Sequence, residues 1–91
     1  MIIKQEINGK FITGTTRRGN HTNIYFGKIT AWPSKEHYIN GDCMRARTLK
    51  NLWLGVDSDK FKEKILEAGR ILVNEIDREE EIINLKGGLK P

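Results

Sequence analysis

The chain changes its hydrophobic period once, at Gly55. Before that glycine, apolar and polar residues alternate over short runs, a pattern typical of half-buried strands. After it, apolar residues recur at spacings of three and four, which indicates an amphipathic helix. The sequence therefore predicts an α+β fold: a small antiparallel sheet of three to four strands in residues 1–55, packed on one long helix in residues 56–91. We expect a single domain, because 91 residues lie near the common domain size.

Turn residues mark the strands of the first half. Asn8-Gly9 lies between two β-prone runs, and this pair is a strong hairpin signal because a type I′ turn needs positive φ at both central residues. Residues 24–32 form the best strand, with two alternating faces, and Pro33 ends it. Asn40-Gly41 predicts a second hairpin turn. Residues 42–49 after it fit either a fourth strand or the start of a short helix that continues through Leu54.

The second half predicts one helix over about residues 58–85. Asp57 is a suitable N-cap, Val56 and Phe61 would form a hydrophobic staple, and Gly87-Gly88 supplies a stop. The apolar stripe consists of Phe61, Ile65, Ala68, Leu72, Ile76 and Ile83, widened by Leu66 and Val73.

Such a helix would be roughly 40 Å long, whereas a strand of ordinary length spans only about 17–20 Å. The overhang would expose Ile82, Ile83 and Leu85 beyond an acidic run, which favours a homodimer formed through this helix. The alternative is a break near Asp77-Arg78 that folds the helix back.

Charge is spread unevenly along the chain. The net charge is +4, but residues 1–55 hold nine Lys/Arg against three Asp/Glu, while residues 56–91 hold seven against nine. A basic half beside an acidic half is the distribution expected when one surface meets a polyanion. The alternative is an ordinary solvated surface without a partner.

Motifs for catalysis, metals and cofactors are missing from the sequence. It contains no GxxxxGK[ST], GxGxxG, HExxH or CxxC, and two histidines with one cysteine are too few ligands for zinc. We therefore expect no cofactor and no metal. Cys43 is expected to be a small buried hydrophobe. No apolar run is long enough to span a membrane, and the first residues are too polar for a signal peptide, so we expect a cytoplasmic protein.

The residues with the chemistry for phosphate contact lie in the basic half. The loop of residues 15–23 combines two arginines with hydroxyl and amide groups, and guanidinium forks match phosphate oxygens. The candidate nucleic-acid-binding residues are Arg17, Arg18, His21, Lys28, Arg45, Arg47 and Lys50. The aromatic residues Tyr25, Phe26, Trp32, Tyr38 and Trp53 lie between them, and we expect one or two at most to be exposed for stacking on a base.

Part of the chain resembles the HicA family of messenger-RNA interferase toxins. The resemblance covers residues 10–56 and rests on the Gly-Asn-His-Thr-Asn turn at 19–23 with the strand after it, Pro33, and residues 47–52 and 54–55. It implies a fold like that of double-stranded-RNA-binding domains, with His21 as the catalytic histidine that exchanges a proton with the 2′-hydroxyl or the leaving oxygen. The chain departs from the family at its first nine residues, which predict a strand instead of a helix, and in its long C-terminal helix.

Three functions follow from these observations. The leading prediction is a non-enzymatic binder of RNA or DNA that contacts the backbone. It rests on the nine basic residues of the first half and on the lack of the enzyme motifs named above. The second is an inhibitor or adaptor that binds a host protein, because the chain is similar in general style to small phage accessory proteins. The third is the HicA-like ribonuclease that uses His21.

Overall fold

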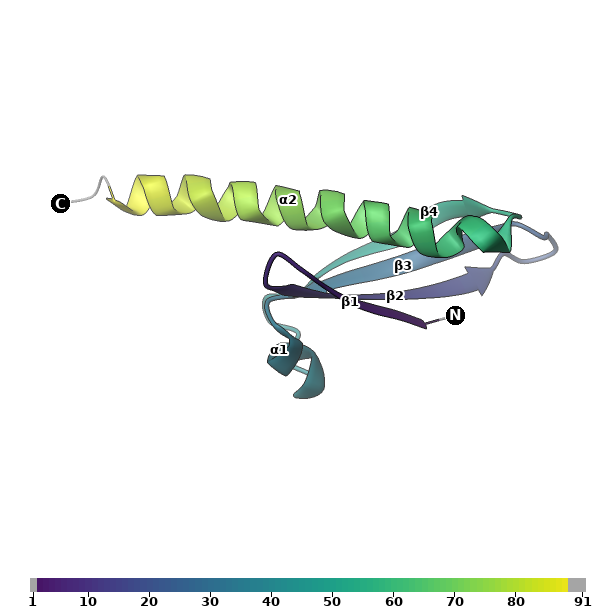
Figure 1. The fold of residues 1–91 in the computed structure, drawn as a ribbon, viewed down its shortest axis with the longest axis horizontal. Helices are drawn as coiled ribbons and strands as arrows, with labels where there is room; N and C mark the ends of the chain where they lie inside the picture. The colour runs from purple at the N-terminus through teal and green to yellow at the C-terminus, as the bar shows by residue number, and fades with distance from the viewer. Residues whose placement is uncertain (1, 89–91) are drawn as a thin grey trace.

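A four-stranded antiparallel sheet with a long helix along one face makes up the protein (Figure 1). The computed structural model describes residues 2–88, and the side chains of residues 2–83. The elements in chain order are β1 (Ile2–Ile7), β2 (Lys10–Arg18), β3 (Tyr25–Trp32), α1 (Lys35–Ile39), β4 (Arg47–Gly55), the short 3₁₀ helix η1 (Ser58–Lys60) and α2 (Phe61–Gly88). The strands lie in the order β1-β2-β3-β4, so each pairs with its neighbour in sequence. The predicted α+β class is confirmed.

The first hairpin forms where the sequence predicts it. Asn8 and Gly9 join β1 to β2 with φ of 49° and 81°, the left-handed conformation that this dipeptide favours. Strand β3 ends before Pro33, and its faces alternate as predicted: Gly27, Ile29 and Ala31 are buried, while Lys28 between them is exposed.

The prediction of a second hairpin at Asn40-Gly41 is wrong. These residues end α1, where the Asn40 N–H donates to the Glu36 carbonyl and Gly41 has a φ of 68°. Ser34 begins the same helix by accepting a hydrogen bond from the His37 N–H. Asn-Gly signals only positive φ, which a helix terminus uses as readily as a hairpin. Of the two alternatives after this turn, the structure has the strand, which begins at Arg47.

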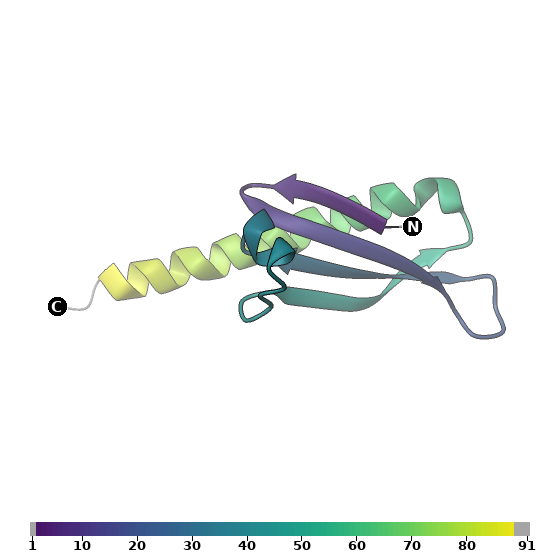
Figure 2. The same ribbon diagram turned by 90° about the horizontal axis from the view of Figure 1, so that it is seen from below.

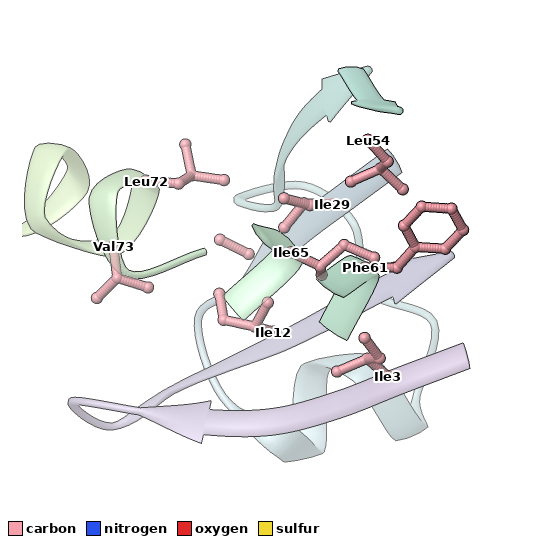
Figure 3. Close-up of a cluster of buried hydrophobic side chains, with 9 residues drawn as sticks. Ile3, Ile12, Ile29, Leu54, Phe61, Ile65, Leu72 and Val73 are labelled. Atoms are coloured by element: carbon pink, nitrogen blue, oxygen red, sulfur yellow. The ribbon is translucent and has the colours of Figure 1, made fainter. Parts of the chain in front are cut away.

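The core lies between the sheet and α2 (Figure 3). Its buried side chains come from every strand and from the first half of the helix: Ile3, Ile12, Ile29, Ala31, Leu54, Phe61, Ile65, Leu72 and Val73. Gly14 lets the helix approach, because a Cβ atom at this position would clash with the Ile65 side chain. The helical periodicity of the sequence therefore selects the face of α2 that covers the sheet.

The last turns of α2 extend beyond the sheet (Figures 1 and 2). The helix runs without a break through Asp77 and Arg78, so the fold-back alternative does not occur. Ile82 and Ile83 are 47% and 66% exposed, while the side chain of Leu85 lies outside the described residues. The homodimer through these residues stays a prediction. Within the described part of the chain, no helix has both the length and the apolar character needed to cross a membrane.

Candidate nucleic-acid interface

The sheet face opposite α2 is covered at one end only, by α1 (Figure 2). Tyr38 of α1 packs against Phe11 and Trp32, with ring centroids 5.1 and 5.5 Å apart. The Lys4 ammonium lies 5.2 Å from the centre of the Tyr38 ring, and the Trp32 indole N–H donates to Thr13 Oγ1 at 3.0 Å. The aromatic residues at this end are therefore used in packing.

No other element in the described part of the chain covers the rest of that face, which we call the open face (Figure 2). It is formed by Thr15 and Arg17 of β2, Phe26 and Lys28 of β3, and Lys50, Asn51 and Trp53 of β4. Contacts across the strands fix this assignment. The Arg17 guanidinium donates to Asn51 Oδ1 at 2.9 Å and lies 5.5 Å from the centre of the Phe26 ring. Residues two apart on a strand point to the same side, so Thr15 and Lys28 share the face with Arg17 and Phe26.

Three cationic side chains surround a shallow pocket on the open face. The pocket has a volume of about 290 Å³ and is lined by Thr15, Arg17, Gly27, Lys28, Lys50 and Asn51, so no carboxylate is among the described residues that line it. The hydroxyl of Thr15 and the amide of Asn51 add neutral hydrogen-bonding groups between the positive charges. This combination suits an anion with several oxygen atoms, such as a phosphodiester.

A β-bulge in β4 shapes one wall of the pocket. Gly27 pairs with Leu52 and Ile29 with Leu49, so Lys28 between them faces two residues, Lys50 and Asn51. Asn51 has a φ of 61°, a conformation in which asparagine is enriched among non-glycine residues. The bulge brings the Lys50 side chain and the Asn51 amide to the same pocket.

Trp53 extends the open face at its edge. It pairs with Phe26 across the sheet, and 61% of its surface is exposed. Lys64 of α2 donates to the Leu54 carbonyl at 2.8 Å and places its ammonium 5.0 Å from the centre of the Trp53 ring. The Lys64 ammonium therefore lies against one side of the Trp53 ring, and most of the side chain remains exposed to solvent.

The structure brings together only part of the predicted binding set. Arg17, Lys28 and Lys50 converge on the pocket. Arg18 follows Arg17 at the end of β2, and His21 lies in the next loop, exposed, with a φ of 57°. The catalytic role that the resemblance implies for His21 stays a prediction.

Arg45, just before β4, and Arg47, the first residue of β4, lie near Glu79 and Glu80 of α2. Arg45 lines a groove with Glu79 and Glu80, and Arg47 donates to Glu79 at 2.5 Å. This hydrogen bond raises the pKa of Arg47 and lowers the pKa of Glu79. The structure therefore separates both arginines from the open face, and Arg47 is neutralised.

Lys10 is neutralised in the same region. Its ammonium contacts Asp77 at 2.5 Å and Glu80 at 3.4 Å. Burial works to lower the pKa of Lys10, but the hydrogen bond and charge of Asp77, with those of Glu80, outweigh it and raise that pKa. Among the described residues, by contrast, no carboxylate forms an ion pair with Arg17, Lys28 or Lys50. The carboxylates of α2 thus compensate cations at the helix side and leave the open face positive.

Two further features bear on the chemistry of the molecule. The expectation of a buried Cys43 is wrong, because this residue is exposed in the loop between α1 and β4. Within the described part of the chain, no cluster of three or more His, Cys, Asp or Glu residues could hold a metal ion.

Sequence reasoning missed Asn51 and the bulge. The signal that could have found them is an asparagine inside a strand, since asparagine adopts positive φ more readily than most residues.

Comparisons of the chain with protein-family models, with curated proteins and with solved structures find no match.

Proposed function

We propose that the protein binds nucleic acid through the open face, by contacts to backbone phosphates and without catalysis. The observation that carries this proposal is the convergence of Arg17, Lys28 and Lys50 on one pocket, with no carboxylate among the described residues that line it. Three cations held near each other raise the local positive potential, and that potential attracts a polyanion more strongly than scattered charges would.

The chemistry of the three side chains fits phosphate in different ways. Arg17 presents a planar fork that can bond two phosphate oxygens, and its bond to Asn51 orients it in advance. Lys28 and Lys50 supply compact charges on flexible stems, which tolerate variation in the position of a phosphate. Such contacts to the backbone carry no base preference of their own, so both RNA and DNA are expected to bind.

The remaining charges of the molecule support the choice of this face. The Asp and Glu residues after Gly55 lie in the helical layer and the segment leading into it, behind the sheet, and some already pair with Lys10 and Arg47. A polyanion would be repelled from the acidic half of α2 and attracted to the open face. The charge asymmetry of the sequence thus becomes an asymmetry between two layers.

The test is the salt dependence of oligonucleotide binding, measured by fluorescence anisotropy with labelled oligonucleotides. With three phosphates contacted, log K is expected to fall against log[salt] with a slope of about 2–3. The triple variant Arg17→Gln, Lys28→Gln and Lys50→Gln should lose most of the affinity and most of this slope.

A matched control removes the same charge from the helical layer. The variant Arg70→Gln, Lys60→Gln and Lys62→Gln carries the same net charge as the open-face variant, and its three positions are all exposed. It should keep most of the affinity. Equal weakening in both triple variants would show that net charge alone is responsible, and affinity that does not change with salt would contradict phosphate contact altogether.

A further inference from the structure

Trp53 is an aromatic side chain that the fold itself does not bury. All seven aromatic residues lie within the described part of the chain, and among them only Trp53 is exposed, while the others are buried or half-buried. Tyr25 packs against Phe61 in the core, and the aromatic residues at the other end pack against Tyr38. An exposed tryptophan beside a positive pocket has the chemistry of a surface on which a nucleic-acid base stacks.

We infer that the open face takes single-stranded nucleic acid, with a base stacked on Trp53 and the neighbouring phosphates in the pocket formed by Arg17, Lys28 and Lys50. This inference rests on the proposed function and adds the class of ligand. A single strand offers both unstacked bases and phosphates to one surface. A duplex keeps its bases stacked inside and offers this flat face only its backbone.

The geometry of the sheet places the two kinds of contact side by side. Trp53 pairs directly with Phe26, and Phe26 and Lys28 are two residues apart on one strand, which separates their Cα atoms by about 7 Å. The aromatic and cationic positions are therefore neighbours on one face. A short stretch of extended strand can reach both.

Two anchored cations lie over the aromatic rings of the open face. Lys64 is anchored to the Leu54 carbonyl and lies near the Trp53 ring, and Arg17 is bonded to Asn51 and lies near the Phe26 ring. Side chains that are ordered before binding lose less entropy when the ligand arrives. The aromatic part of the open face is therefore preorganised, as a stacking platform requires.

The test uses tryptophan fluorescence with three probes: twelve-nucleotide oligo(dT) or oligo(U), a mixed-sequence DNA duplex of twelve base pairs, and inorganic polyphosphate. Oligonucleotide should quench the emission of Trp53 on binding, while polyphosphate should bind without this quenching because it has no bases. Trp53→Leu should remove the quenching and weaken oligonucleotide binding about 5- to 150-fold, the range that corresponds to loss of one stacked base. Its affinity for polyphosphate should stay the same.

Two further variants keep the result interpretable. Trp53→Phe retains a ring and should recover part of the affinity. Trp32→Phe removes the other tryptophan, which is packed beside Tyr38, and should leave the quenching intact. Circular dichroism of each variant shows whether it is folded.

The outcomes separate this inference from the proposed function. Equal affinity for duplex and single strand, or normal oligonucleotide binding by Trp53→Leu, would overturn single-strand stacking even if the triple open-face variant fails to bind. Absence of binding to all three probes would overturn both proposals. Preference for the single strand with loss in Trp53→Leu supports the inference.

Discussion

Alanine at Gly14 should destabilise the protein, because α2 lies directly against this position. A Cβ atom there would be 2.6 Å from Cγ2 of Ile65, closer than real Cβ contacts allow. Cγ2 is attached to the branched Cβ of a side chain that is 0% exposed, so it can move only if the helix or the strand moves. Overpacking of this kind costs about 1–3 kcal/mol.

A second effect acts in the opposite direction and sets the net magnitude. Replacing glycine by alanine restricts the unfolded chain and stabilises a protein by about 0.4–1 kcal/mol where the native backbone accepts it. The expected loss for Gly14→Ala therefore lies between about 0 and 2.6 kcal/mol, with a central value of about 1.3 kcal/mol. In a domain of this size each kcal/mol lowers Tm by about 4–8 °C.

Gly27 provides the matched control on the adjacent strand. A Cβ atom there would be 3.4 Å from Cδ1 of Leu54, at the edge of ordinary van der Waals contact and against the end of a flexible side chain. Gly27→Ala should therefore be neutral or stabilising by up to about 1 kcal/mol. The two substitutions are chemically identical, so the difference between them isolates the close contact with Cγ2 of Ile65.

Urea unfolding followed by circular dichroism measures both variants. Ile65→Leu removes the Cγ2 methyl, so the double variant Gly14→Ala with Ile65→Leu should be more stable than the sum of the two single effects predicts. If Gly14→Ala proves as stable as Gly27→Ala, or if Ile65→Leu brings no recovery, then the helix does not approach the sheet as closely as the structure has it.

Two more predictions concern α2. The lowered pKa of Glu79 means that its bond to Arg47 contributes stability above the unfolded pKa of about 4.5 and loses it as the pH falls through the folded pKa. Glu79→Gln should thus be less stable than the unmodified protein in urea at neutral pH, and the difference should vanish in acid; a difference independent of pH would contradict the pairing. Leu72→Ala, at a buried position, should cost about 2–5 kcal/mol, whereas Ile83→Ala, at an exposed one, should change stability by less than about 0.5 kcal/mol. If a second copy covers this position, the loss of stability in Ile83→Ala should instead grow with protein concentration. Sedimentation experiments on the unmodified protein should then show the dimer.

The fold could be predicted where the sequence signal is local. The change of period at Gly55 reflects a physical difference between strands, whose side chains alternate, and a helix, whose apolar stripe follows 3.6 residues per turn. The hairpin turn at Asn8-Gly9 could be predicted because its signal is also local: both residues must adopt positive φ within the turn itself. Asn40-Gly41 carries the same local signal, but α1 before it is only five residues long and has no buried side chain, so it leaves little periodicity to detect.

The grouping of the cations could be predicted only in part, because it depends on neighbours that are distant in sequence. Arg47 and Lys50 lie three residues apart on β4, and nothing local distinguishes them as candidates for phosphate contact. Arg47 pairs with Ala31 on the face that α2 covers, and there it meets Glu79. Lys50 lies at the bulge and lines the pocket on the open face.

The same bulge decides which side of the sheet Trp53 occupies. Strict alternation from Leu49, which pairs with the buried Ile29, would place Trp53 on the helix side with it. The extra residue at Lys50-Asn51 reverses the parity, so Leu52 and Leu54 point to α2. Trp53 then faces outward. One asparagine in a left-handed conformation thus directs Leu52 and Leu54 of β4 to the helix side and Trp53 to the open face, so the single-strand binding that we infer depends on that conformation as much as on the cations.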